Sequence, residues 1–178
     1  MFRAPVLALA FAAAFAVAPL TAQEATPEPH MTLSRMAEIV QALDENARLT
    51  PNGFEFTIDD VPVLIIADEG ANRMRAMVPI ASSDGMTEEE LLRAMQANFD
   101  SALDARYAVA RGRLWGVFLH PMRELERDQL ISGIAQTVNV AQTYGGLYTS
   151  GAAQFGAGDS SGLQAQLLER LLDKGEDI

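Results

Sequence analysis

The apolar residues between positions 31 and 146 follow one order of spacings: a helix, three strands, a helix, two strands and a helix. No Gly- or Ser-rich stretch interrupts this segment, so it is expected to form one domain. Strands grouped between helices, instead of alternating with them one by one, are typical of the α+β fold class, here α-βββ-α-ββ-α. This order limits the chain to few folds.

Three amphipathic stretches predict the helices. Thr32 is placed to cap the first helix, and residues 87–90 fit a capping box, in which a threonine and a glutamate satisfy each other's backbone amides. Pro51 and Gly53 are expected to stop the first helix. The expected buried stripes are Leu33, Met36, Val40, Leu43 and Ala47, then Leu92, Met95, Phe99 and Leu103, and then Leu130, Ile134, Val138 and Ala141.

Five stretches predict strands. Phe54, Phe56 and Ile58 alternate with polar residues, which indicates a strand with one buried face. Residues 61–67 are nearly all apolar, so this strand is either covered on both faces or lies at an oligomer contact. The turns are expected at Asp59 and Asp60, at 68–72 and at Arg111 and Gly112, and the other strands at 73–78, 107–110 and 114–119.

The first 22 residues have the composition of a secretory signal peptide. After Arg3, the apolar run between the prolines is about 15 residues long, short of the roughly 20 that span a bilayer as a helix. Cleavage is expected after Ala22, with Ala18 as the other site considered, and an uncleaved N-terminal anchor is the competing interpretation. A cleaved product would be periplasmic, without stable membrane insertion.

The composition limits the kinds of partner and of chemistry that the chain can have. The chain has 13 basic and 24 acidic residues, a formal net charge of −11, and the acidic residues are spread along it as on a solubilising surface. Such a charge repels nucleic acid phosphates and anionic lipid, so no nucleic acid partner is expected. The chain has no cysteine, which excludes disulfides, thiol nucleophiles and thiolate metal sites.

Three segments flank or follow the domain at 31–146. Residues 23–30 contain two prolines and two glutamates and are expected to be a tether. Residues 147–162 are rich in Gly, Ser, Ala and Thr and are expected to be a flexible linker. Residues 163–178 predict a short amphipathic helix. Because such a helix is not stable alone in water, it should pack on its own domain or bind another chain.

Few side chains offer chemistry. His30 and His120 have no second histidine or cysteine near them in the sequence, so each is expected to be a surface or turn residue. No serine lies in a Gly-x-Ser-x-Gly elbow, and no Gly-rich phosphate loop opens a helix. Asp68, Glu69 and Asn72 are too few for a dedicated calcium site and favour a solvated hairpin tip. No enzyme, cofactor or metal site is expected.

One strand face carries the candidate partner-binding residues. Met77 has the same strand phase as Arg73 and Arg75, which places these side chains opposite to the apolar residues of that strand. If Trp115, which alternates with Leu114, lies on the same face, then Met, Arg and Trp form a patch of the composition found at interface anchors. A half-exposed face covered by the C-terminal helix is equally compatible with the pattern.

Two stretches carry a family resemblance. Residues 53–64 read Gly-Phe-Glu-Phe-Thr-Ile-Asp-Asp-Val-Pro-Val-Leu, and residues 98–134 contain a helix end, a strand, the Arg-Gly turn, a strand and a helix. With the order of elements, residues 31–146 resemble the YbjN family of bacterial sensory transduction regulators and the related class I type III secretion chaperones. The resemblance implies a bent antiparallel sheet packed on helices and a non-enzymatic domain that holds another polypeptide, often as a dimer in the chaperone branch. Those chaperones work in the cytosol, whereas the leader of this chain is expected to direct the domain out of it, so the YbjN branch is the closer analogue.

Two functions fit these observations. The first is an exported, non-catalytic interaction domain, an adaptor, chaperone or regulator, that binds a protein partner or a second copy of itself. The alternative is a periplasmic sensor, in which a cavity between sheet and helices holds a small apolar molecule and the C-terminal helix is a lid. The sequence leaves the partner and the oligomeric state open.

Overall fold

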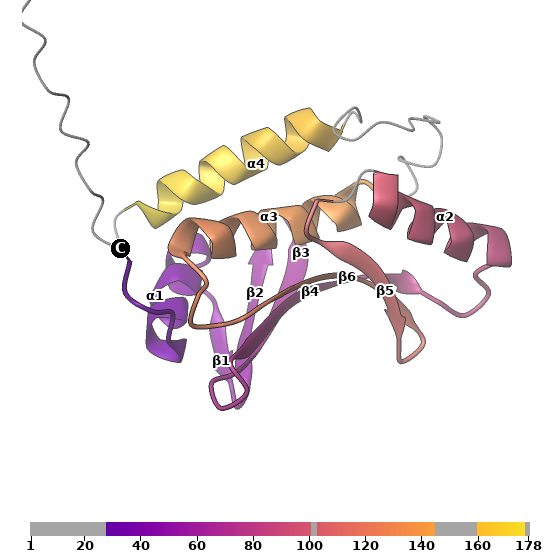
Figure 1. The fold of residues 1–178 in the computed structure, drawn as a ribbon. Coiled ribbons are helices and arrows are strands. Elements are labelled where there is room, and N and C mark those ends of the chain that lie inside the picture. The colour runs from indigo at the N-terminus through magenta and orange to yellow at the C-terminus, as the bar shows by residue number, and fades with distance from the viewer. Residues whose placement is uncertain (1–27, 101–102, 145–159, 177–178) are drawn as a thin grey trace, which may run out of the picture.

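The computed structural model describes residues 28–100, 103–144 and 160–176. The helices are α1 (Leu33–Leu43), α2 (Glu88–Asp100), α3 (Arg127–Gln142) and α4 (Ser160–Gly175), and the strands are β1 (Arg48–Thr50), β2 (Gly53–Ile58), β3 (Val61–Asp68), β4 (Arg73–Ser82), β5 (Arg106–Ala110) and β6 (Arg113–His120). The predicted α+β class is confirmed, and the short strand β1 is an addition to the predicted order (Figure 1).

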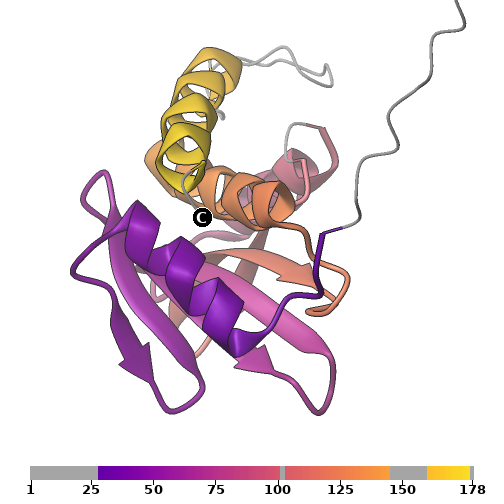
Figure 2. The same ribbon diagram turned by 90° about the vertical axis from the view of Figure 1, so that its left-hand side faces the viewer.

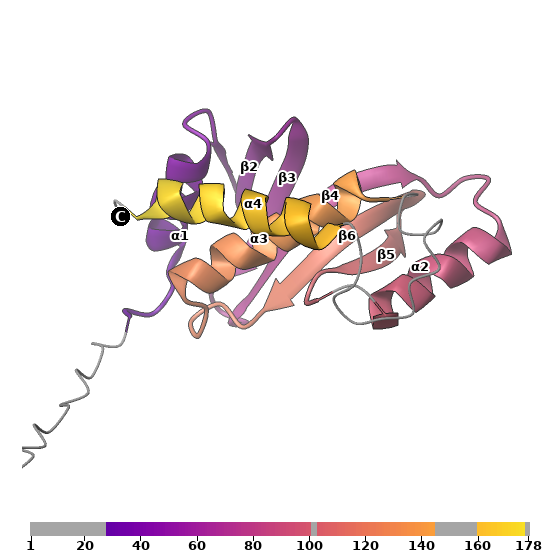
Figure 3. The same ribbon diagram turned by 90° about the horizontal axis from the view of Figure 1, so that it is seen from above.

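The six strands form one antiparallel sheet in the order β1-β2-β3-β4-β6-β5. Helix α2 carries the chain from β4 to β5 at the edge of the sheet. Strand β6 then returns between these two strands and pairs with both. Helices α1 and α3 lie on one face of the sheet, as Figure 2 shows, and α4 crosses over α3 as a third layer (Figure 3). Among the described residues, no helix covers the opposite face, which points downward in Figure 1.

The main core lies between the inner face of the sheet and helices α1, α3 and α4. The inward side chains of the central strands are Phe54, Phe56 and Ile58 in β2, Val63, Ile65 and Ala67 in β3, and Met74, Ala76 and Val78 in β4. Helix α3 is buried almost all round because the sheet lies on one side of it and α4 on the other. At Gly133 it approaches β6 so closely that a Cβ atom would stand 2.4 Å from the Phe118 ring. A side chain at this position would therefore push α3 away from the sheet.

Helix α1 begins as predicted and ends earlier. Thr32 Oγ1 accepts a hydrogen bond from the Arg35 amide at 3.2 Å, which confirms the predicted cap. The helix ends at Leu43, so the prediction that Ala47 belongs to it is wrong. The Asp44 carboxylate accepts hydrogen bonds from the backbone N–H groups of Thr57 and of Asn46, each at 2.9 Å, and these bonds lower the pKa of Asp44. They favour a turn toward the sheet over another helical turn.

Helix α2 has the predicted N-terminus but buries a different face. The Glu90 amide donates to Thr87 Oγ1 at 3.2 Å and the Thr87 amide donates to the Glu90 carboxylate at 2.7 Å, which confirms the capping box. The predicted buried stripe is wrong, since Leu92, Met95, Phe99 and Leu103 are all exposed. Ala94 and Ala97 are buried instead, in a small cluster with Ala105, Tyr107, Leu114 and Val140. Alanines let the helix backbone approach β5 closely, so the side of α2 with small residues faces inward.

Helix α4 packs on its own domain, which is one of the two arrangements that the sequence allows. Leu167 and Leu171 belong to the main core. The Arg170 guanidinium donates to both carboxylate oxygens of Asp59, at 3.1 and 2.6 Å, and lowers the pKa of that carboxyl. Lys174 Nζ donates to the carbonyl oxygen of Leu43 at 3.0 Å, so α4 is also joined to the end of α1.

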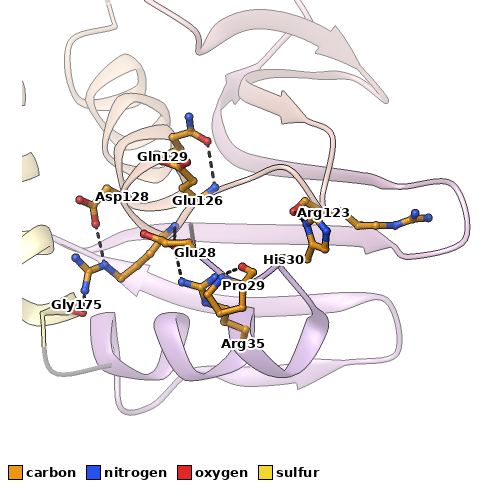
Figure 4. A network of polar contacts seen from close by, with 10 residues as sticks. Glu28, Pro29, His30, Arg35, Arg123, Glu126, Asp128, Gln129 and Gly175 are labelled. Atoms are coloured by element: carbon orange, nitrogen blue, oxygen red, sulfur yellow. Dashed lines mark hydrogen bonds and ion pairs between the residues drawn. The ribbon is translucent and has the colours of Figure 1, made fainter. Parts of the chain in front are cut away.

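The N-terminal end of the described chain is attached to the domain (Figure 4). The Glu28 carboxylate accepts hydrogen bonds from the Arg127 amide at 3.1 Å and from the Arg35 guanidinium. His30 Nδ1 donates to the Arg123 carbonyl oxygen at 3.1 Å. The last residues of the predicted tether therefore contact α1 and the start of α3.

Several predicted segments lie outside the described residues: the signal peptide, residues 23–27 of the tether and residues 147–159 of the linker. Helix α4 begins at Ser160, within the predicted linker. Among the helices of the described residues, none combines the length and the hydropathy that crossing a membrane requires.

Leu171→Ala is expected to lower the free energy of unfolding by about 2–5 kcal/mol, because it leaves a cavity between α4 and the helices beneath it. Urea unfolding followed by circular dichroism measures this change. Glu169→Ala, at an exposed position of the same helix, should change the free energy by less than about 0.5 kcal/mol. If Leu171→Ala were as stable as the unaltered chain, α4 would not be part of the core.

Ala94→Leu is expected to lower the free energy of unfolding by about 1–3 kcal/mol, because it overpacks the contact between α2 and β5. Leu92→Ala removes an exposed side chain and should stay within about 0.5 kcal/mol of the unaltered protein. The same urea titration ranks the two variants. The reverse order would place the leucine face of α2 inside.

Candidate functional site

The face of the sheet that no described helix covers is the candidate site, and we call it the outer face. Its side chains alternate with the core residues along β3, β4, β6 and β5. Leu64 is opposite Met77 in the register of β3 and β4, and Met77 is opposite Val117 in the register of β4 and β6. Leu119 is opposite Arg75. Apolar side chains from three neighbouring strands thus meet at the centre of the outer face.

The centre of the outer face is hollow, with a volume of about 530 Å³. Its lining consists of Leu64, Ile66, Arg75, Met77, Ala108, Ala110, Arg111, Trp115, Val117 and Leu119. Apart from the two arginines, every lining residue is apolar or aromatic. Ile66 and Leu119 are 47% and 57% exposed, so water reaches this apolar floor. A concavity of this size and composition is suited to receive side chains of a partner or an apolar ligand.

Trp115 forms part of the wall of the hollow. Its indole Nε1 donates to the carbonyl oxygen of Ala110 at 3.0 Å, across the β5–β6 hairpin. The guanidinium carbon of Arg113 lies 6.0 Å from the ring centroid, within reach of a cation–π contact. The polar end of the ring is therefore fixed, and the ring itself remains half-buried. A fixed aromatic ring of this kind loses little conformational entropy when a partner binds to it.

The structure brings together three of the four residues predicted from the sequence. Arg75, Met77 and Trp115 line the hollow. Arg73 lies on the same face of β4, two residues before Arg75, and is exposed, but it does not line the hollow. The interpretation that the C-terminal helix covers this face is wrong, because α4 lies over α3 on the other side of the sheet (Figure 1).

Leu64, Ile66, Val117 and Leu119 belong to the outer face and were not predicted as site residues. The apolar run at 61–67 is the sequence feature that points to an apolar site on this strand, because it predicts a strand that is covered on both faces or lies at an oligomer contact. In the structure one face of β3 is buried, and on the other face Ile66 stays open to water. Within the described residues, the strand is thus not covered on both faces.

A second apolar surface lies along α2. Leu92, Met95, Phe99 and Leu103 are between 48% and 75% exposed. Together with Val109 on the neighbouring edge strand β5, they place apolar side chains at one end of the molecule. The acidic first turn of α2, at Glu88, Glu89 and Glu90, lies beside this stripe. This second surface is separate from the hollow of the outer face.

A groove of about 570 Å³ lies between α3, α4 and β6. Leu168 and Leu172 of α4 border it, and seven of its eleven lining residues are polar or charged. His120 Nδ1 donates to the carbonyl oxygen of Pro121 at 2.7 Å, and Gln136 Oε1 accepts from the Asp104 amide at the same distance. These polar groups are thus engaged with the chain itself. Of the residues described here, no three His, Asp or Glu side chains are grouped so as to hold a metal ion.

No protein-family model matches the sequence, and the comparison with curated proteins finds no relative. Among solved structures, the chain is similar to the Yersinia pestis type III secretion chaperone SycH, which was crystallised with a stable fragment of YscM2. The identity is 20%, the alignment covers 63% of this chain and 98% of that one, and the TM-score is 0.50.

Two further structures are similar. One is the HopA1–SchA chaperone–effector complex, with 10% identity, coverage of 61% of this chain and 91% of the other, and a TM-score of 0.48. The second is the ExsC–ExsE complex, with 12% identity, coverage of 66% and 98%, and a TM-score of 0.48. The likeness to SycH shows that this chain has the fold of type III secretion chaperones, as the resemblance implied. The YbjN affiliation stays a prediction.

Proposed function

We propose that this chain is a non-catalytic protein-interaction domain, an adaptor, chaperone or regulator, that binds a polypeptide partner through the outer face of its sheet. The apolar hollow lined by Met77 and Trp115 carries the proposal. Tryptophan and arginine are enriched among the residues that dominate binding energy at interfaces, and methionine adapts its shape to a partner. No described element covers this apolar face, and a partner that removes it from water lowers the free energy of the complex.

The fold supports a binding role. SycH, which shares this fold, forms a complex with a stable fragment of YscM2. Fold likeness carries no function by itself, so the composition of the outer face of this chain is what favours the same kind of role. We also propose that the chain is related to the YbjN family, whose order of elements it resembles.

We also propose that the domain is exported to the periplasm. The support lies in residues 1–22, whose charge and apolar run are typical of a signal peptide. Cell fractionation followed by N-terminal sequencing of the mature protein tests this part. Export predicts a periplasmic chain that begins at residue 23, whereas an uncleaved chain in the cytosol would contradict it.

Two other modes of action have an observation in their favour. The exposed stripe of α2 favours self-association, since apolar side chains at one end of the molecule become buried in a dimer. The groove bordered by α4 favours the small-ligand sensor with α4 as a lid, although the polar and charged residues among its lining suit an apolar molecule poorly. Native mass spectrometry distinguishes them: a dimer doubles the mass, and a small ligand adds a small mass that disappears on denaturation.

Trp115→Ala is expected to weaken binding of the natural partner by about tenfold or more, because it removes an aromatic anchor from the wall of the hollow. The partner is first captured from periplasmic extract of the source bacterium, identified, purified and then titrated by calorimetry. The melting temperature of the variant should stay within a few degrees of that of the unaltered chain.

Leu92→Ala, on the exposed stripe of α2, is the matched control and should bind the same partner with unchanged affinity. The proposal is contradicted if Trp115→Ala binds as tightly as the unaltered chain and Leu92→Ala binds more weakly. A folded Met77→Ala variant repeats the test at a second position if Trp115→Ala fails to fold.

A further inference from the structure

Four arginines surround the hollow of the outer face, and we call them the rim arginines. Arg75 and Arg111 line the hollow, and Arg113 lies over the Trp115 ring. Arg73 lies two residues before Arg75 in β4 and is exposed on the same face. In a chain whose net charge is −11, this face thus concentrates positive charge around an apolar floor.

The rim arginines differ from most other arginines of the chain in their partners. Arg35, Arg48, Arg93, Arg127 and Arg170 each form an ion pair with a carboxylate. Within the described ranges, none of the rim arginines forms such a pair. No Asp or Glu is among the residues that line the hollow. Glu55, which lies opposite Leu64 in the sheet register, pairs with Arg48 instead. Within the described part of the chain, no ion pair thus neutralises the rim arginines.

Two further carboxylates lie near the rim arginines without forming an ion pair with them. Asp68 is opposite Arg73 in the sheet register, but its Oδ1 accepts a hydrogen bond from the Ala71 amide at 2.9 Å and closes the β3–β4 hairpin. Asp84 lies beside the β5–β6 turn, where its Oδ1 would be 3.8 Å from a Cβ atom on Gly112. Neither carboxylate belongs to the lining of the hollow.

We propose, building on the binding role above, that the segment bound at the outer face is acidic as well as apolar. Its apolar side chains fill the hollow over Met77 and Trp115, while its Asp or Glu carboxylates pair with Arg75 and Arg111. A guanidinium presents parallel N–H donors that match the two oxygens of a carboxylate, so arginine is suited to this contact. Exclusion of water by the apolar part of the segment strengthens these ion pairs.

The shape of the outer face favours a polypeptide over an anionic membrane. A hollow of about 530 Å³ accepts individual side chains that project from a chain, whereas a lipid headgroup layer meets a protein across a broad surface. The chain as a whole also carries 24 acidic residues against 13 basic ones, and this charge opposes approach to an anionic bilayer.

Trp115 is the single tryptophan of the chain and lies in the hollow, so its fluorescence reports occupancy directly. The probes are two tryptophan-free peptides of about ten residues, roughly 33 Å when extended. In one peptide Leu and Phe alternate with Glu, and in the other Gln replaces every Glu. Vesicles that contain phosphatidylserine form a third arm. Each probe is added to three forms of the full chain. These are the unaltered protein, the double variant Arg75→Gln and Arg111→Gln, and the single variant Arg123→Gln.

The Glu peptide is expected to shift the Trp115 emission and to bind at least about tenfold more tightly than the Gln peptide, the factor that one charge-assisted contact supplies. The double variant should lose this preference and bind both peptides alike. Arg123→Gln removes a charge from an exposed arginine outside the hollow and should keep the full preference. Circular dichroism confirms that each variant is folded.

Three results would overturn the proposal. Equal binding of both peptides, with the emission shift retained, would remove the acidic preference and leave the proposed protein-binding role intact. A shift of Trp115 emission with vesicles and not with peptides would assign the outer face to a membrane. No response to either peptide or to vesicles would mean that the outer face is closed to extended segments, and the proposed function would fail with it.

Discussion

The burial of helix α3 between the inner face of the sheet and helix α4 is the constraint on which the rest of the structure depends. Because both helical layers stack on one side of the sheet, the apolar side chains of α1, α3 and α4 belong to a single core. The absence of a side chain at Gly133 lets α3 pack closely against β6, and the burial of Leu167 and Leu171 holds α4 above α3. Within the described residues, no helix is left to cover the outer face. Its apolar hollow is thus a consequence of one-sided packing.

Local signals in the sequence predict local structure well in this chain. The caps at Thr32 and Thr87 depend on side chains that bind amides three residues away, so the sequence contains both partners of each bond. The end of α1 is different. Asp44 ends the helix partly through a hydrogen bond to the amide of Thr57, which comes close only when β2 is in place. A partner so distant in sequence cannot be recognised from helical spacing.

The buried side of a helix and the members of a site depend on what packs beside them. Helix α2 has two usable sides, and the approach to β5 selects alanines over leucines, although the leucines form the stronger apolar stripe. On the outer face, strand phase correctly groups Met77 with Arg75. Ile66 and Leu119 join them only through the registers of β3, β4 and β6, which the sequence does not contain as a local pattern.

We propose that binding takes place on the outer face of the sheet and leaves the helical layers unchanged. Methyl NMR with a soluble paramagnetic probe, recorded on the free chain and on its complex with the purified partner, measures this directly. We expect the methyl groups of Ile66, Met77 and Leu119 to be broadened in the free chain and protected in the complex. Those of Leu167 and Leu171 should be protected in both states. Protection that appears on α2 or α4, while the methyl groups of the outer face stay broadened, would contradict it.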